Sequence, residues 1–181
     1  MKCEFTPALR IATLVVLMTL LLLGMIGRKQ WTLSMGTRVM LETQPIDPRS
    51  LFRGDYVRLN YTIQSFDINA YPHLAAVKRG DVIFVVLKKG EPYWQVADIS
   101  SVWPEQGGVV LRGEVERNSM GTIRVSYGIE SYFVPEGEGR TLERPAADEK
   151  VSIEVAVDSW GKAAIHSVRI NGTVRYVETL F

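Results

Sequence analysis

The sequence predicts an all-β domain, a small barrel or a sandwich, that follows one N-terminal transmembrane helix. Two observations support this prediction. The residues from Ile11 to Ile26 form an uncharged and mostly apolar run, whereas the chain beyond Trp31 breaks into short segments rich in β-branched and aromatic residues. Turn-forming residues separate these segments at a spacing that is typical of a barrel or a sandwich. After the apolar run, no segment of ten or more residues has a convincing amphipathic helical pattern.

The apolar run is interpreted as an uncleaved membrane anchor that contacts the lipid bilayer. Sixteen helical residues extend about 24 Å, which is short of a hydrocarbon core of about 30 Å. Leu9 can lengthen the span if Arg10 snorkels to the interface. A cleaved signal peptide is the alternative, but no small-x-small cleavage site follows the run, and a basic pair and Trp31 suit a membrane boundary. The sequence therefore predicts residues 1–29 as tail and anchor, and 30–181 as one extracytoplasmic domain.

Charge and cysteine content exclude several classes of protein. From residue 30 onward the chain has 17 basic and 19 acidic residues. This balance does not suit a nucleic-acid surface, so no nucleic-acid partner is expected. Cys3 is the single cysteine, and neither a CxxC pair nor a Cys/His metal spacing occurs. We expect no metal and no cofactor, and a domain of this size must be stabilised by its apolar core.

Apolar segments between turn residues predict the strands of the domain. Three hairpins are expected, at 82–99, 109–127 and 151–170, because turn residues join their arms. The segment 65–76 is interpreted as a loop or one short helix, and 135–150 as a long loop rich in Glu, Gly and Pro. The expected strands are 37–43, 56–63, 82–87, 93–99, 109–117, 122–127, 151–158, 163–170 and 174–181.

The most distinctive stretch is the turn that introduces the strand 56–63. Gly54 can adopt a positive φ without steric cost, and Asp55 can accept hydrogen bonds from backbone N–H groups just downstream. The strand period of two then places Leu59 and Tyr61 on one face and Tyr56 on the other. We interpret these five residues as a structural turn with its strand, or as a contact site for a partner.

These five residues match, position by position, the signature of the GDYXXLXY family of bacterial membrane-anchored proteins, which the chain resembles over most of its length beyond the anchor. A second stretch, 132–143, is similar to the other common segment of that family. The resemblance implies an N-terminal anchor and an envelope location. Because members often accompany polytopic membrane proteins, it also implies a partner of that kind. It implies no particular reaction.

We therefore expect a non-catalytic accessory or assembly subunit of a complex in the bacterial cytoplasmic membrane. A ligand-binding or sensory envelope module is the alternative. The least favoured hypothesis is a hydrolase similar to the serine–lysine signal peptidases, in which Ser34 would be the nucleophile and Lys88 or Lys89 the base. Ser34 lacks the proline-containing context of those enzymes. The lysines lie in a predicted turn, where solvation makes them poor general bases.

Two further patterns are interpreted as structural. The sequence Arg-Gly-Asp-x-aliphatic occurs at 53–57 and again at 79–83, in both cases where a turn enters a strand. Shared turn chemistry explains this repeat better than an adhesion motif or a duplication. His73 and His166 stand far apart in the sequence, and surface or strand positions are expected for both.

Overall fold

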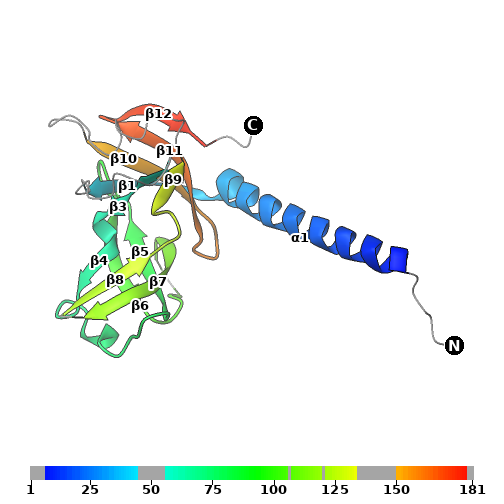
Figure 1. The fold of residues 1–181 in the computed structure, drawn as a ribbon. Coiled ribbons are helices and arrows are strands. Elements are labelled where there is room, and N and C mark those ends of the chain that lie inside the picture. The colour runs from blue at the N-terminus through cyan, green and yellow to red at the C-terminus, as the bar shows by residue number, and fades with distance from the viewer. Residues whose placement is uncertain (1–6, 45–55, 106, 120, 134–149, 179–181) are drawn as a thin grey trace.

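The computed structural model describes residues 7–44, 56–105, 107–119, 121–133 and 150–178. One long helix, α1 (Pro7–Met35), projects from a domain built of strands (Figure 1). The prediction of an all-β domain with one N-terminal helix is confirmed. The helix is longer than the apolar run and ends at Met35, six residues inside the segment that the sequence assigned to the domain.

The described strands form two five-stranded antiparallel sheets and one two-stranded ribbon. The first sheet has the order β12-β11-β10-β1-β3, the second has the order β4-β8-β7-β5-β6, and the ribbon pairs β2 with β9. Figure 1 shows that α1 leaves the domain beside the first sheet. The strands are β1 (Thr37–Gln44), β2 (Tyr56–Arg58), β3 (Asn60–Tyr61), β4 (Ser65–Asp67), β5 (Val82–Lys88), β6 (Gln95–Ser100), β7 (Val109–Ser119), β8 (Thr122–Ser126), β9 (Ser131–Phe133), β10 (Val151–Val157), β11 (Ala163–Ile170) and β12 (Thr173–Val177).

All three predicted hairpins form. The strand pairs β5–β6, β7–β8 and β10–β11 are antiparallel. The turns of the second and third hairpins contain Gly121 at φ +77° and Gly161 at φ +79°, a backbone region that glycine adopts without steric cost. The predicted closing strand also forms, because β12 pairs with β11.

The prediction of one continuous strand at 56–63 is wrong. In the structure β2 pairs with β9, β3 pairs with β1, and Thr62–Gln64 forms a 3-10 turn, η1. The chain changes partner at Leu59, whose N–H donates to the carbonyl of Glu130 at 2.8 Å. An alternating pattern reports which face a residue occupies, but it does not indicate which strand is the hydrogen-bonded partner, so it could not reveal this change.

The segment 65–76 was predicted as a loop or one short helix, and its short helix is present as the 3-10 turn η2 (Pro72–Leu74). The prediction missed the short strand β4 before it, which pairs with β8. Three residues are too few for a periodic pattern to distinguish a strand from a loop. The predicted long loop at 135–150 lies, except for its last residue, outside the described residues.

One apolar core is shared by the two five-stranded sheets. Leu41 and Ile153 come from the first sheet, Ile83 and Leu111 come from the second, and each is at most 1% exposed. These side chains belong to a single cluster that includes residues of both sheets. The domain therefore has the large apolar core that a chain with one cysteine requires.

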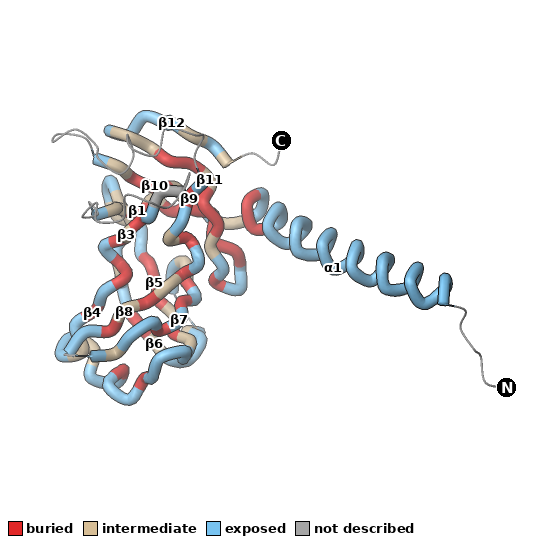
Figure 2. Tube along the Cα trace, in the orientation of Figure 1, coloured by how far each residue is buried: buried red, intermediate tan, exposed pale blue. Residues whose placement is uncertain are grey.

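Helix α1 has the properties of a membrane span. It is exposed from Pro7 to Trp31, as Figure 2 shows, and it is the one described helix that is long and apolar enough to cross a bilayer. The hydroxyls of Thr13 and Thr19 each donate to the carbonyl four residues earlier at 2.9 Å. These bonds satisfy the polar groups that hydrocarbon would otherwise leave without a partner.

Candidate functional site

The two segments that the sequence singled out lie next to each other. In the ribbon, Tyr56 is opposite Phe133, Val57 is opposite Tyr132, and β2 and β9 run antiparallel. The signature stretch therefore pairs directly with the start of the second segment, 132–143. Gly54 and Asp55 of the signature, and residues 134–143 of the second segment, lie outside the described residues.

Leu59 and Tyr61 of the signature lie in the core, at 5% and 2% exposure. The hydroxyl of Tyr61 donates to the carbonyl of Ile129 at 2.7 Å, and the hydroxyl of Tyr127 donates to the carbonyl of Ile63. Burial, together with the nearby carboxylate of Glu130, raises the pKa of both tyrosines well above the ordinary value. Both hydroxyls therefore stay protonated and act as donors, and they tie the signature stretch to the segment after β8.

The carboxylate of Glu130 accepts several hydrogen bonds in this region, and the sequence analysis did not identify this residue. Its carboxylate joins the turn after β8 to η1, because the amide of Gln64 donates to it while the side-chain oxygen of Gln64 accepts the N–H of Tyr61 at 3.0 Å. We call Tyr61, Gln64, Tyr127 and Glu130 the signature lock. The donors to Glu130 are the N–H groups of Tyr127 and Gly128, the hydroxyl of Ser126 and the side-chain amide of Gln64.

A second polar centre fixes α1 to the domain. Gly36 alone separates α1 from β1, and its N–H donates to the carbonyl of Thr32 at 2.9 Å. A Cβ atom at this position would lie 2.4 Å from that carbonyl oxygen and 2.9 Å from the backbone nitrogen of Val157. Leu33, from the last turns of α1, packs with Ala156 and Ala164. The helix is thus joined to the first sheet by close backbone contact rather than by a linker.

Asp158 completes this junction. The residue is 9% exposed, and its carboxylate accepts hydrogen bonds from the hydroxyl of Thr32 at 2.9 Å, the N–H of Trp160 at 3.0 Å and the N–H of Lys162 at 2.9 Å. The turn between β10 and β11 also contacts the second sheet, because the N–H of Arg112 donates to the carbonyl of Gly161 at 2.8 Å. One turn therefore holds α1, β10 and β7 in a fixed arrangement.

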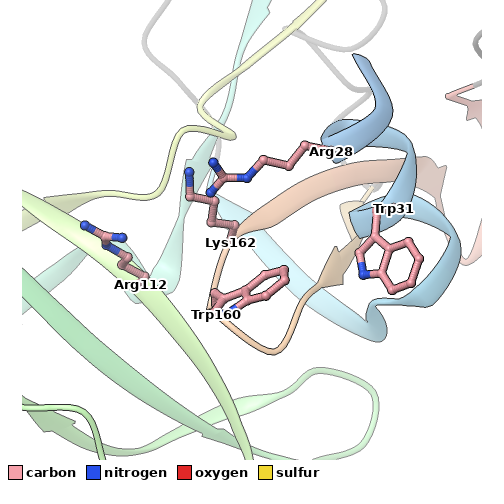
Figure 3. A pocket seen from close by; sticks show the side chains of 5 residues that line it. All are labelled: Arg28, Trp31, Arg112, Trp160 and Lys162. Carbon is pink, nitrogen blue, oxygen red and sulfur yellow. The ribbon is translucent and has the colours of Figure 1, made fainter. Parts of the chain in front are cut away.

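A pocket of about 420 Å³ opens at this junction. Figure 3 shows the guanidinium of Arg28 reaching from α1 toward Lys162, with Trp31 and Trp160 nearby. Both indole rings are more than half exposed. We call this the junction pocket, and three of its side chains are cations, whereas none is a carboxylate. Its lining residues are Arg28, Trp31, Arg112, Trp160 and Lys162.

The neighbouring cation of α1 has a different environment. Lys29 donates to the carboxylate of Glu178 at 2.7 Å, in an ion pair beside a second hollow of about 340 Å³ that Tyr132 and Ile165 help to line. Among the described residues no carboxylate pairs with Arg28, Arg112 or Lys162. The two adjacent basic residues of α1 thus differ. Lys29 is neutralised by a carboxylate of the domain, whereas Arg28 is available to bind an anion.

The sequence pointed to only part of the junction pocket. The residues around Trp31 were expected at a membrane boundary, and they do lie at the end of α1. Arg112, Trp160 and Lys162 were not identified, because they come from a strand and a turn that are far from α1 in the sequence. A partial signal exists in the turn itself, where the sequence Asp-Ser-Trp-Gly-Lys stands between two apolar strands.

The residues of the hydrolase hypothesis lie on different elements. Ser34 is exposed on α1, where the amide of Gln30 donates to its hydroxyl at 3.4 Å, and α1 contacts β10 and β11. Lys88 and Lys89 are exposed at and just beyond the end of β5, which pairs with β6 and β7. In the part of the chain that the structure describes, no group of three or more His, Cys, Asp and Glu side chains could hold a metal ion.

His166 lies on β11 in a charged cluster. The carboxylate of Glu154 accepts hydrogen bonds at 2.9 Å from Ser167 and Arg169, and Nδ1 of His166 is 3.7 Å away. Burial opposes charge on Glu154, but the bonds from Arg169 and Ser167 outweigh it and lower its pKa. The pKa of His166 is also lowered, first by burial and then by the nearby guanidinium of Arg38, against the opposing effect of Glu154.

The family follows from comparison with known sequences. A protein-family model described as the GDYXXLXY protein matches residues 18–168. The chain belongs to the GDYXXLXY family. The match starts within α1 and ends within β11, so it includes the helix–domain junction and the signature lock. No curated protein and no solved structure matches this GDYXXLXY chain.

Proposed function

We propose that this GDYXXLXY-family protein is a non-catalytic accessory or assembly subunit of a bacterial membrane complex. We expect the stretch from Ile11 to Ile26 to span the cytoplasmic membrane and the domain to lie on the extracytoplasmic side. The observation that supports this role best is the rigid junction between α1 and the first sheet. A catalytic domain on a tether does not require such a junction, whereas a subunit that contacts a partner in two places benefits from it.

The junction couples a surface in the membrane to a surface outside it. Almost all of α1 is free of contacts with the domain, so lipid or the helices of a partner can cover its apolar faces. Gly36 and Asp158 fix the direction in which the domain projects from α1. A polytopic partner could therefore bind α1 and the domain together, and the second contact would form at a high effective concentration because the geometry is preset.

The test is affinity purification of the tagged full-length chain from its native membranes after chemical cross-linking. We expect one polytopic membrane protein in near-stoichiometric amount. Insertion of four flexible residues after Gly36 should sharply reduce its recovery while the chain remains in the membrane fraction. The matched control is the same insertion after Gly172, in the exposed turn between β11 and β12. Recovery of no polytopic protein, or equal recovery with both insertions, would refute the assembly role.

The absence of catalysis is a separate part of the proposal. Ser34→Ala and the double variant Lys88→Ala/Lys89→Ala should retain wild-type activity in a complementation assay. A serine nucleophile needs a desolvated base within about 3 Å and donors for an oxyanion, whereas both lysines are exposed. If both variants lose function while expression and membrane insertion stay normal, the hydrolase hypothesis replaces the subunit hypothesis.

A further inference from the structure

We propose that the junction pocket binds the phosphate headgroup of an anionic phospholipid. The proposal rests on insertion of α1 into the bilayer, which is part of the proposed function, and goes beyond it by assigning a ligand to a defined site. The ligand would orient the domain on the membrane surface. Three properties of the pocket support this assignment, namely its level relative to the bilayer, the chemistry of its side chains and its fixed geometry.

The pocket lies where lipid headgroups would be. The apolar run ends at Ile26, so a rise of 1.5 Å per residue places the backbone of Arg28 about 3 Å and that of Trp31 about 7.5 Å beyond it along the helix axis. The headgroup layer on each side of the hydrocarbon core is about 5–7 Å thick. Trp160 and Lys162 line the same pocket, so the turn that carries them is at the same level.

The side chains suit a phosphate bound to a glyceride. Guanidinium groups donate two parallel hydrogen bonds to phosphate oxygens, and a lysine adds a compact charge. Arg28, Arg112 and Lys162 supply these groups, and no carboxylate lines the pocket to compete for them. Indole rings are enriched at the headgroup level of membrane–water interfaces. The exposed Trp31 and Trp160 therefore suit a pocket that lies among lipid headgroups.

The pocket is fixed before any ligand binds. Asp158 accepts the N–H groups of Trp160 and Lys162, and Gly161 binds the backbone of Arg112, so three lining residues have anchored backbones. The contrast with Lys29 is informative, because its ion pair with Glu178 neutralises it within the protein. A site whose geometry is set in advance loses less entropy on binding than a mobile cluster of basic side chains.

The experiment uses the full-length chain in a neutral maltoside detergent. Phosphatidylglycerol and phosphatidylcholine with identical acyl chains are titrated separately, and native mass spectrometry measures the bound fraction of each. We expect the wild type to retain phosphatidylglycerol preferentially. Arg112→Gln/Lys162→Gln should weaken its binding by roughly 20- to 30-fold, since each basic residue near a membrane surface contributes a factor of about five. Lys78→Gln/Arg117→Gln, at exposed positions near the opposite end of β7, removes the same charge and should change nothing.

Two further measurements make the outcome decisive. Inorganic phosphate is titrated as a competitor, and it should displace phosphatidylglycerol only at far higher concentration. Equal retention of the two lipids, unchanged binding by Arg112→Gln/Lys162→Gln in a folded chain, or displacement by phosphate at equal concentration would each overturn the proposal. Carbonate extraction of membranes tests the anchor separately. A chain that resists extraction but shows no lipid preference refutes the lipid site alone, whereas an extracted chain refutes the anchor.

Discussion

The signature lock and the helix–domain junction have the same kind of hydrogen-bonded centre, but the two centres position different kinds of side chain. In each, one carboxylate collects several hydrogen bonds from a tight turn and from a distant element. Glu130 accepts bonds from the turn after β8 and from η1, and Asp158 accepts bonds from the turn after β10 and from α1. The difference lies in the side chains that the carboxylate positions. At Glu130 they are tyrosines that point into the core, and at Asp158 they are a tryptophan and a lysine that line an open pocket.

From this difference we expect the signature lock to contribute to stability and the junction pocket to contribute to binding. All polar groups of the signature lock are satisfied by other parts of the domain, so we expect a substitution there to act mainly on folding. At the junction pocket the cations lie at the end of the long apolar helix α1, and we expect a substitution of Arg112 or Lys162 to act mainly on binding. The four predictions below test this distinction, from the largest expected effect to the smallest.

The largest effect is expected at Tyr61. Tyr61→Ala should cost about 3–5 kcal/mol in the free energy of unfolding, because it leaves a cavity in the core. Tyr61→Phe keeps the ring and removes only the bond to Ile129, so it should cost about 1 kcal/mol. Urea unfolding of the full-length chain in detergent measures both. If Tyr61→Ala unfolds like the parent yet abolishes function, the signature residue is a contact site and the distinction fails.

The second prediction compares the two carboxylates directly. Glu130→Ala and Asp158→Ala should each cost about 2–3 kcal/mol, because each leaves several donors unsatisfied. Only Asp158→Ala should also loosen the attachment of α1, which spin labels at Leu23 and Arg175 would report as a broader distance distribution. Asp158→Asn keeps an acceptor and is the control. Equal broadening in Glu130→Ala would show that the two centres are not independent.

The third prediction concerns the turn of the signature. Gly54→Val should cost about 1 kcal/mol or more if its φ is positive, and Asp55→Ala about 1 kcal/mol through a lost side-chain bond. Thermal unfolding measures both changes. The related turn at 79–81 gives the comparison, since Gly80 has φ +90° and the carboxylate of Asp81 accepts the N–H of Lys78. Unchanged melting with loss of function in cells would favour partner contact instead.

The smallest effect is a dependence of stability on pH. The folded state lowers the pKa of His166, so the unfolded chain binds more protons near and below the ordinary histidine pKa of about 6.5. The resulting stability is fully present above that value and decreases as the pH falls through it toward the lower folded pKa. Arg38, Arg169 and Glu154 face this ring, and His166→Gln should flatten the profile between pH 7.5 and 5.5. An unchanged profile in that variant would contradict the assignment, and NMR titration of His166 measures its pKa directly.

The sequence by itself determined the elements with local causes. The apolar run from Ile11 to Ile26 predicted the helix, and apolar segments between turn residues predicted all three hairpins. Gly121 and Gly161 show why the hairpin turns were predictable. Both have a positive φ, and a turn that needs such a φ favours glycine, which is visible in the sequence. The signature residues were identified for the same reason, since turn and strand preferences are properties of a few neighbouring residues.

The tertiary structure alone decided which of these elements meet. Nothing local indicates that the strand at 56–63 divides between a ribbon and a sheet, or that Glu130 lies beside Tyr61. The junction pocket brings together Arg28, Arg112 and Lys162, which are separated by 84 and 50 positions in the chain. Such contacts depend on sheet order and on how α1 leaves the domain, and these follow from burial of one shared core rather than from the preferences of any single segment.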